Sequence, residues 1–373
     1  MSQAPSILLG LAGLNVVGGI ACVSRCIARA LDEAIEEGSV ELADRILLLD
    51  EPDFLHPPPL RGHQTLARGS QRKMVWQLWR AMQRTRYDLV FFDHFGLARA
   101  TQLPLPGLSP SRYAIFCHGI EIDALAGRPL AGRAIERAWR VLVNSDFTRS
   151  RVQERFPAVA DRIRVTPLCI DPQRLERWQD RLSNGRNPSR EMAVLIVGRV
   201  ESIERGKGHE TLIEAWPEIL RRVPGAQLWV VGDGNDRARI EAEARRRAPP
   251  ETIHFFGEVD DAKLSDLYQR ASVFAMPSRQ EGFGLVYAEA MWHGLPCIGS
   301  TQDAARDLIE HQTNGLLVTY GSVAEVVESV CALLTDTNLH SRLSIRARET
   351  AQERFTYDRF GRDFLSAMEL LPG

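Results

Sequence analysis

Short runs of apolar residues alternate with segments of helical spacing along the whole chain. Apolar positions at helical spacing in residues 20–35 and 75–82 predict amphipathic helices there. Short, continuous apolar runs that are separated by helices are typical of a parallel sheet covered on both faces. In the first half, we expect strands at residues 7–11, 45–49, 89–92, 113–117, 141–143 and 163–166.

The same pattern restarts after a polar stretch at residues 171–190. The pairs Asn184-Gly185 and Asn187-Pro188 are turn formers, so we interpret this stretch as an interdomain linker. A second series of strands is expected at residues 193–197, 227–231, 252–256, 273–276, 297–299 and 316–318.

Two consecutive doubly wound α/β units follow from this pattern. We predict a first Rossmann-like domain over residues 1–180 and a second over residues 190–355. A last helical segment follows them, and our hypothesis for residues 356–373 is a helix that packs back on the first domain. Because this fold carries many chemistries, the function has to be argued from particular residues.

Composition and charge exclude one class of partner. Hydrophobic residues make up 44% and charged residues 25% of the chain, which is the profile of a soluble globular protein. The formal net charge is −2, so bulk electrostatics does not favour nucleic acid as a partner. The first 180 residues carry a net +3 and the remainder −5, so the basic excess lies at the N-terminal end.

The N-terminal apolar stretch at residues 7–23 has the length of a signal peptide. It has no positively charged segment before it, and Asn15 interrupts it. We therefore interpret it as a strand, a glycine-rich turn and the start of a helix. None of the six cysteines forms a C-x-x-C pair, so we expect buried, reduced thiols. Together these features predict a cytoplasmic protein.

The most informative stretch is PSRQEGFGLVYAE at residues 277–289, where a loop connects a strand to a helix. Unpaired N–H groups at the start of a helix favour an anion such as a diphosphate. Gly282 and Gly284 permit close approach of the backbone to a ligand. Glu281 and Glu289 could accept hydrogen bonds from hydroxyls on two parts of one polyol ligand. The alternative for each carboxylate is a solvated or capping side chain.

A second constellation surrounds a strand end in VGRVESIERGKGHE, residues 197–210. Arg199 and Lys207 lie in the loop after this strand, at the carboxyl end of the predicted sheet. Two cations there could neutralise a diphosphate leaving group, the arginine as a bidentate fork and the lysine as a point charge. The alternative is a pair of solvated loop cations.

These motifs resemble glycosyltransferase family 4, the large retaining family of GT-B glycosyltransferases. The resemblance implies an α/β protein of the GT-B fold, with two Rossmann-like doubly wound domains facing a central cleft. The matching pieces occur in the family's order, and they are VGGI (17–20), CHGIE (117–121), NSDFT (144–148), GR…KG (198–208), VVGDG (230–234), FFGEV (255–259), EGFGLVYAE (281–289) and HGLPCIGS (293–300).

The resemblance implies roles for residues of the second domain. Arg199 and Lys207 would hold the donor diphosphate. Glu281 would lie near the transferred sugar, and Glu289 would bind the ribose hydroxyls. Backbone groups would contact the sugar hydroxyls at Gly282, Phe283 and Gly284, and the phosphates at Leu285 and Val286.

In the first domain, the resemblance assigns Gly18 and Gly19 to a loop that faces the nucleotide and the acceptor. His118 would lie close to the reacting sugar, with Asn144 and Ser145 in its supporting loop. The catalytic group implied by the resemblance therefore comprises His118, Glu281, Arg199 and Lys207. The donor site would be independent of metal and of any cofactor, and the sequence has no cluster typical of a metal site.

Two stretches depart from known patterns. Family members often have Pro-Asn-Gly-Val-Asp where this chain has Pro-Leu-Cys-Ile-Asp at residues 167–171, so the loop near the interdomain hinge departs from the family's pattern. Gly232 and Gly234 begin a pattern similar to a dinucleotide-binding fingerprint. Its third glycine is replaced by Arg237, which argues against a nicotinamide cofactor.

The leading hypothesis is a retaining glycosyltransferase that moves a hexose from a UDP- or GDP-sugar onto a glycan or a lipid-linked acceptor. The resemblance favours a role in bacterial cell-surface or exopolysaccharide assembly. Two alternatives within enzymes are a nucleotide-sugar epimerase and a phosphorylase of the same fold. A third alternative, from another class, is a catalytically silent glycan-binding scaffold.

The segment from Arg61 to Arg86 contains seven Lys or Arg residues and no Asp or Glu. Within it, Val75, Leu78, Trp79 and Met82 form an apolar stripe at helical spacing. A basic helix of this kind can lie on an anionic membrane surface, so peripheral contact with the inner face of the membrane is one hypothesis. The alternative is an ordinary helix whose stripe packs on the sheet and whose charges, at Arg72, Lys73, Arg80 and Arg84, are solvated.

Overall fold

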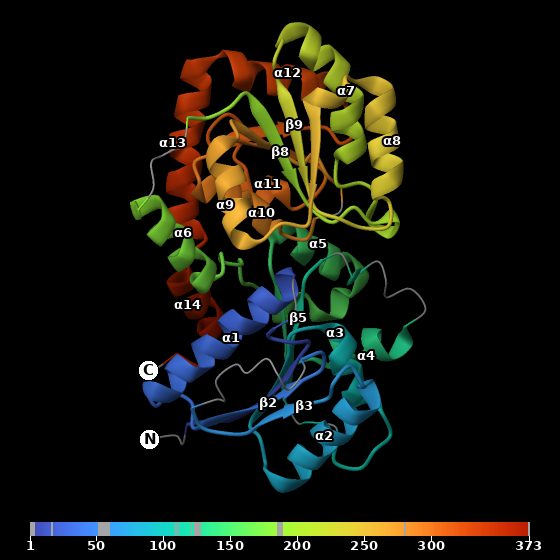
Figure 1. Cartoon of the computed structure of the whole chain (residues 1–373). Coiled ribbons are helices and arrows are strands. Elements are labelled where there is room, and N and C mark those ends of the chain that lie inside the picture. Colours follow the sequence, from blue (N-terminus) through green and yellow to red (C-terminus); the bar gives the residue numbers. More distant parts are fainter. Residues whose placement is uncertain are drawn as a thin grey trace. The chain divides into compact units, whose positions relative to one another are not determined.

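The computed structural model describes residues 4–15, 18–50, 60–108, 110, 112–119, 121–122, 128–184, 189–279 and 281–371. Parts of the stretches discussed above lie outside the described residues, among them residues 16–17, Ile120, Gln280 and residues 185–188 and 372–373. The chain divides into two compact units, Met1–Asp171 with Tyr357–Gly373, and Pro172–Thr356 (Figure 1).

The first unit is built on a parallel sheet whose described strands run in the order β3-β2-β1-β4-β5-β6-β7. All of them except β3 overlap predicted apolar runs, although β2 begins and ends earlier than the predicted run at 45–49. The strand β3 has only three residues, none of them buried, at the edge of the sheet, so it lacks the apolar run that predicts a strand. The strands are β1 Ser6–Leu11, β2 Leu42–Leu47, β3 Gln64–Leu66, β4 Leu89–Phe92, β5 Tyr113–Cys117, β6 Arg140–Val143 and β7 Ile163–Val165.

Helices cover both faces of this sheet. On one face, Val90 and Phe92 pack in a cluster with side chains of α2 to α5. On the other face, the Phe91 ring meets the Phe364 ring edge-to-face, with centroids 5.4 Å apart. The helices of this unit are α1 Gly19–Glu36, α2 Gln71–Arg84, α3 Phe95–Ala98, η1 Arg99–Gln102, α4 Pro129–Arg137, α5 Asp146–Arg155, η3 Pro157–Arg162 and α14 Tyr357–Ala367.

The helix α14 belongs to the first unit although it follows the second unit in the sequence. It packs on α1, and the Tyr357 hydroxyl donates a hydrogen bond of 2.6 Å to Glu33 Oε2. The Arg29 guanidinium lies 4.2 Å from the centroid of the Tyr357 ring. These contacts give the last segment of the chain a fixed place on the first sheet.

The second unit repeats the architecture, with described strands in the order β10-β9-β8-β11-β12-β13, all parallel. They are β8 Ala193–Val197, β9 Gln227–Val231, β10 Ile253–Gly257, β11 Val273–Ala275, β12 Cys297–Ser300 and β13 Gly315–Val318. The helices are α6 Pro172–Asn184, η4 Ser202–Glu204, α7 His209–Arg222, α8 Arg237–Arg247, η5 Pro250–Thr252, α9 Asp261–Arg270, α10 Leu285–Trp292, α11 Ala305–Leu308, α12 Val323–Thr335 and α13 Thr337–Arg354.

The prediction of a linker at residues 171–190 is wrong over most of that stretch, because residues 172–184 form the helix α6. Its Trp178 is fully buried. The Trp178 ring packs against those of Tyr268 and His293, with centroids 6.3 and 4.7 Å apart. One buried aromatic anchors an otherwise polar helix, which is why composition alone suggested a linker. The second unit therefore begins at Pro172, earlier than the predicted residue 190.

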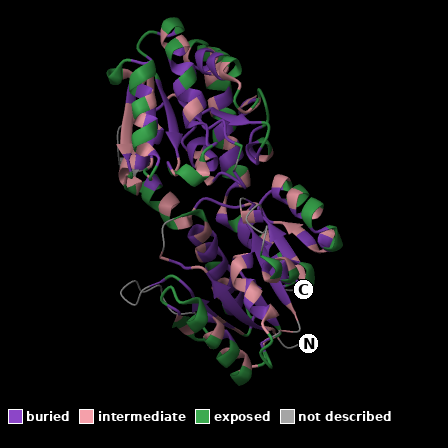
Figure 2. Cartoon of the chain, turned by 90° about the vertical axis from the view of Figure 1, so that its right-hand side faces the viewer, coloured by how far each residue is buried: buried purple, intermediate pink, exposed green. Residues whose placement is uncertain are grey.

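Figure 2 shows buried strands in each unit with more exposed helices around them. Every residue of β1, β4, β5 and β8 is buried, as expected for strands with both faces covered. All six cysteines are buried and free. Within the described ranges, no helix combines the length and the apolar character that a membrane crossing requires.

Candidate active site

The strand order places a topological switch point in each unit. In the second unit, β8 lies between β9 and β11, so the chain leaves β8 toward one edge of the sheet and later returns on its other side. Ligands of doubly wound folds bind at such a point, outside the carboxyl ends of the strands. The loop after β8 carries Arg199 and Lys207, and the loop after β11 carries Glu281.

Lys207 and Glu281 meet between these two loops. Lys207 Nζ donates a hydrogen bond of 2.6 Å to Glu281 Oε1, and both side chains are buried. Although burial disfavours the charge, the nearby carboxylates of Glu281 and Glu204 raise the pKa of Lys207. Lys207 therefore stays cationic at the switch point.

Glu204 connects Arg199 to this pair. Its carboxylate accepts a hydrogen bond from Arg199 Nη2, and its Oε2 lies 3.6 Å from Lys207 Nζ. The Arg199 side chain is 70% exposed, so its guanidinium can reach a ligand in solvent. The structure thus brings together three of the predicted residues, Arg199, Lys207 and Glu281. Glu204 was missed, although its spacing of three residues from Lys207 offered a signal.

Glycines shape both loops of the switch point. Gly208 has φ +99°, and a Cβ there would come within 2.7 Å of Pro277 Cδ. Gly284 has φ +85°, and a Cβ there would come within 2.6 Å of Tyr287 Cδ2. Only glycine adopts these conformations without strain. The two positions start α7 and α10 directly beside the loops that carry the charged residues.

The helix α10 begins at Leu285, as predicted, after the loop at residues 281–284. The first N–H groups of a helix have no partner within it, and they carry partial positive charge. Leu285 and Val286 are half-buried at this end, whereas Gly282 and Phe283 are buried. The phenyl ring of Phe283 meets Phe355 edge-to-face at 5.9 Å, which holds the loop on the unit's core.

Asp303, which was not identified from the sequence, supports the Glu281 loop. This fully buried carboxylate accepts hydrogen bonds from Ser278 Oγ, from Ala305 N at 2.9 Å and from Glu281 N at 3.3 Å. Burial raises the pKa of Asp303 to about 7, and hydrogen bonding to Ser278 opposes this rise. The carboxylate follows β12, the neighbour of β11, so its position at a strand end was the available signal.

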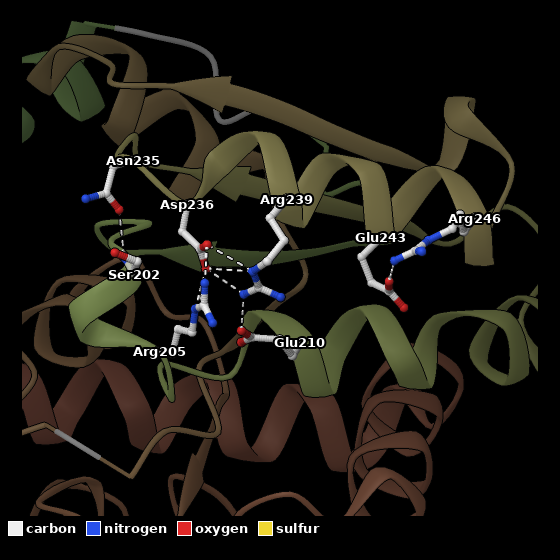
Figure 3. Close-up of polar contacts among 8 residues, drawn as sticks. All are labelled: Ser202, Arg205, Glu210, Asn235, Asp236, Arg239, Glu243 and Arg246. Atoms are coloured by element: carbon white, nitrogen blue, oxygen red, sulfur yellow. Dashed lines mark hydrogen bonds and ion pairs between the residues drawn. The ribbon is translucent and has the colours of Figure 1, made fainter.

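A polar network around Asp236 holds the loop that carries Arg199 and Lys207 (Figure 3). Asp236 is buried and accepts two hydrogen bonds from Arg205, of 2.8 and 3.0 Å. It also binds Arg239, which reaches Glu210 at 2.6 Å. The hydrogen bonds from Arg239 and Arg205 lower the pKa of Asp236. The loop is therefore tied to α8 and to the start of α7.

Glu289 lies in a separate cluster on α10. Its buried carboxylate accepts hydrogen bonds from Arg174 Nη1 at 2.5 Å and from the Tyr268 hydroxyl at 3.1 Å. The charge of Glu289 raises the pKa of Arg174, and burial opposes that rise. Arg174 also reaches Asp261 Oδ1 at 2.8 Å. Neither Arg174 nor Tyr268 was identified from the sequence, because both lie outside the motif and meet it only through the fold.

In the first unit, β1 lies between β2 and β4, which places a second switch point there. Asp93 follows β4 and is fully buried. Its carboxylate accepts hydrogen bonds from Ala12 N, at 2.8 and 3.0 Å, and from Ser24 Oγ at 2.5 Å. Burial raises the pKa of Asp93 to about 7. Asp93, which was not identified from the sequence, therefore connects the loop after β1 with α1.

His118 follows β5, the strand next to β4. Its Nε2 lies 2.8 Å from the Asp93 carbonyl oxygen. That oxygen only accepts, so Nε2 carries the proton and the neutral ring presents Nδ1 as an acceptor. Loss of hydration lowers the pKa of His118 to about 4, so the ring is neutral near pH 7. Asn144 Nδ2 donates to the His118 carbonyl at 2.9 Å.

The other predicted residues of this unit lie at helix starts. Gly18, with φ +133° and open space around its Cβ position, caps α1, and Gly19 is its first residue. Ser145 caps α5 and accepts a hydrogen bond of 3.0 Å from Thr148 N. These positions surround the carboxyl edge of the first sheet, where Asp93 and His118 also lie.

The buried side of the basic helix α2 is rotated relative to the predicted apolar stripe. Met74 and Leu78 are its buried residues, whereas Val75 and Met82 are half-buried. Trp79 was placed in the packed stripe, but it is 38% exposed, and its Nε1 donates to the Pro106 carbonyl at 3.0 Å. Arg72, Lys73, Arg80 and Arg84 are all exposed. Packing thus accounts for one side of α2 and leaves a basic, tryptophan-bearing side in solvent.

No group of three or more His, Cys, Asp or Glu side chains suited to a metal ion occurs in the described part of the chain. Arg199, Lys207 and the start of α10 are positive groups that this edge offers to an anion. The arrangement can therefore bind and stabilise a diphosphate.

Two family models match the chain in succession. A model of glycosyltransferase family 4 matches residues 17–174, and a model of glycosyl transferases group 1 matches residues 191–336. Among curated relatives, the GDP-mannose-dependent alpha-(1-6)-phosphatidylinositol monomannoside mannosyltransferase of Mycobacterium tuberculosis is 30% identical over 228 residues, which cover 57% of each chain. The chain matches between 41% and 61% of the length of its most similar curated relatives.

Solved structures match over nearly the whole chain. Sucrose-phosphate synthase from Thermosynechococcus elongatus has a TM-score of 0.78 at 21% identity and covers 98% of both chains. The Anabaena protein HepE, in complex with UDP-glucose, has a TM-score of 0.74 at 18% identity and covers 98% of this chain and 100% of its own. These matches confirm the predicted α/β fold class with two Rossmann-like units.

Proposed function

The chain belongs to glycosyltransferase family 4, and we propose that it is a retaining enzyme that transfers a hexose from a nucleotide-diphosphate sugar to a glycan or lipid-linked acceptor. The observation that carries the proposal is the pair of Lys207 and Glu281, 2.6 Å apart at the switch point of the second unit. The pair joins a phosphate-binding cation to a carboxylate that suits sugar hydroxyls.

The chemistry follows from the charges that develop during transfer. Breaking the bond between the anomeric carbon and the diphosphate leaves negative charge on the phosphate oxygens. Arg199, Lys207 and the N-terminal turn of α10 would stabilise that charge. In this proposal no metal ion takes part, since protein cations occupy the place of a metal at the leaving group.

The remaining predicted residues receive roles around the sugar and the nucleotide. Glu281 would bind hydroxyls of the transferred hexose, and the 282–284 backbone would line the same subsite. Glu289, held by Arg174 and Tyr268, would bind the ribose. His118 would accept a hydrogen bond at Nδ1 from the reacting sugar, and Gly18 and Gly19 would leave room for nucleotide and acceptor.

The names of relatives support the donor and acceptor classes. The mycobacterial relative uses GDP-mannose and acts on a phosphatidylinositol mannoside, and a Rhizobium meliloti relative is a lipopolysaccharide core glycosyltransferase. HepE binds UDP-glucose. We therefore propose a UDP- or GDP-hexose donor and a lipid-linked acceptor of cell-surface glycan assembly. The exposed basic side of α2 would meet the anionic inner face of the membrane, where such an acceptor lies.

A panel of UDP- and GDP-hexoses tests the proposal, with nucleoside diphosphate release measured with and without lipid-linked or glycan acceptors. Transfer is expected for one donor, with the anomeric configuration retained in the product by NMR. Conversion of one nucleotide sugar into another, without release, would indicate an epimerase instead. Tight donor binding with no turnover on any acceptor would indicate a glycan-binding scaffold.

A further inference from the structure

A cavity of about 430 Å³ opens in the first unit beside α2. Its walls come from α2, from α3 with the adjoining η1, and from the start of α4. This volume lies within the range of roughly 300 to 1,000 Å³ that is usual for small-molecule pockets. None of its lining residues is among those assigned to donor binding, and nothing in the proposed transfer reaction uses it.

The wall of the cavity is apolar. Met74 and Leu78 form its buried floor on α2, and Val75 stands beside them, half-buried. Leu97, Leu103 and Leu130 close it from the facing elements, and all three are half-buried. The free energy falls when a hydrocarbon chain covers apolar surface of this kind and removes it from water.

The rim of the same cavity is basic. Arg72 is exposed at the mouth, and Arg99, half-buried across from it, donates a hydrogen bond to the Gln71 side chain. The segment from Arg61 to Arg86 has no acidic residue, so nothing within it offsets these charges. An apolar floor beneath a cationic rim is complementary to a molecule with a hydrocarbon chain and an anionic head.

The neighbouring surface suits a membrane as the source of that molecule. Trp76 and Trp79 on α2 are 50% and 38% exposed, and Leu105 is 44% exposed. Amphipathic tryptophans and exposed leucines beside arginines are typical of a surface that enters the interface between lipid head groups and acyl chains. A free anion in solution would use the rim but leave the apolar floor empty.

We propose that this cavity binds one hydrocarbon chain of an anionic membrane lipid, with the lipid phosphate between Arg72 and Arg99. Insertion of the chain adds an apolar contribution to the free energy of membrane binding, beside the electrostatic attraction between α2 and anionic lipids. It also fixes where the protein lies on the membrane. The inference rests on the proposed function only for the choice of a membrane lipid as the occupant. A second copy of this chain is an outcome of the test below.

Calorimetry with short-chain lipids below their micelle concentration tests the site on the intact protein. The probes are dioctanoyl phosphatidic acid, its dihexanoyl analogue, dioctanoyl phosphatidylcholine and glycerol 3-phosphate. Affinity should rise about fourfold for each methylene that enters the cavity. Dioctanoyl phosphatidic acid should therefore bind most tightly and glycerol 3-phosphate weakest. Equal affinity for the two phosphatidic acids, or for lipid and glycerol 3-phosphate, would overturn the chain site.

Two pairs of variants locate the binding. Val75→Phe fills the cavity and should weaken dioctanoyl phosphatidic acid at least about tenfold, whereas Gln83→Phe, exposed on the same helix away from the cavity, should not. Arg72→Gln with Arg99→Gln should remove the preference for phosphatidic acid over phosphatidylcholine, and Arg84→Gln should keep it. Circular dichroism and thermal unfolding verify that each variant folds.

The result is separable from the outcome for the transferase. Hydrolysis of the donor without acceptor reports on the donor site, and Val75→Phe should leave it unchanged. Size-exclusion chromatography with light scattering shows whether two copies cover the cavity. One outcome is that the wild type is a dimer, that Val75→Phe dissociates it, and that neither protein binds lipid. That outcome would show that a second copy of the chain covers the cavity, and it would overturn the proposal.

Discussion

Lys207 Nζ lies 2.6 Å from Glu281 Oε1, and only 11% of either side chain is exposed. The two residues come from the loops after β8 and β11, which flank the switch point of the second sheet. A bound diphosphate would compete with Glu281 for Lys207. The Glu281 carboxylate would then be free to accept hydrogen bonds from hydroxyls of the sugar. The ion pair thus holds both side chains in place before the donor arrives.

Removing one partner of this pair should be more harmful than replacing both. We expect Glu281→Ala to lower the free energy of unfolding by about 3 kcal/mol, because Lys207 then stays buried with its nearest carboxylate, Glu204, 3.6 Å away among the described residues. The double variant Lys207→Met/Glu281→Leu should recover part of this loss. Urea denaturation measures both, with Lys263→Met, 43% exposed, as the control. Additive losses in the double variant would contradict the coupling.

The stability of the second unit should depend on pH through Asp303. Its pKa is about 7 in the folded protein and about 3.9 in an unfolded chain. Between these values the folded state retains a proton that the unfolded state has lost. The contribution of Asp303 to stability is therefore full below pH 4 and falls by at most about 1.4 kcal/mol per unit as pH rises to 7.

Asp303→Asn, which stays neutral, should remove this part of the pH dependence. Chemical denaturation between pH 4.5 and 7.5 should show the wild type losing stability relative to the variant as pH rises. A difference between the two proteins that stays constant across this range would show that Asp303 is ionised throughout. Asp93→Asn gives the same comparison in the first unit, because burial raises that pKa to about 7 as well.

Recognition of the ribose should fail in a specific way when Glu289 is changed. The wild type should use a 2′-deoxy donor about ten- to a hundredfold less efficiently by kcat/KM, since a hydrogen bond to a charged group is lost. Glu289→Ala should treat the ribose and 2′-deoxyribose donors alike. Tyr268→Phe, which removes one hydrogen bond to Glu289, serves as an intermediate case. Unchanged discrimination in Glu289→Ala would remove the residue from the ribose site.

Transfer should survive metal chelation. Arg199 and Lys207 supply the positive charge at the proposed diphosphate position, so no divalent cation is required there. Activity in excess EDTA should equal activity in buffer, and added Mg²⁺ or Mn²⁺ should not raise it. Loss of activity in EDTA that Mn²⁺ restores would show that the leaving group depends on a metal.

The apolar runs were sufficient to predict both sheets and the start of α10, because strands buried on both faces have a clear pattern. Weaker signals failed for physical reasons. The strand β3 is short and unburied, and α6 is polar except for Trp178. The phase of α2 was misjudged because Trp79 is apolar by type but exposed in place.

Some residues of the site could likewise be predicted from the sequence, and others could not. Arg199, Lys207 and Glu281 lie in motifs at strand ends, so the order of strands brings them together. Asp303 and Arg174 act through contacts with residues that are 22 and 115 positions away in the sequence. Asp303 also follows a strand, but which residues it and Arg174 contact depends on how distant segments pack, and local spacing does not give that.

Arg199 and Lys207 are proposed to stabilise a diphosphate leaving group, and kcat/KM for the preferred nucleotide sugar measures this stabilisation directly. We predict that Arg199→Ala and Lys207→Ala each lower it by a factor on the order of a hundred or more. The matched controls Arg245→Ala and Lys263→Ala, at exposed positions of the same unit, should retain wild-type turnover. Near wild-type turnover in folded Arg199→Ala and Lys207→Ala would contradict the account.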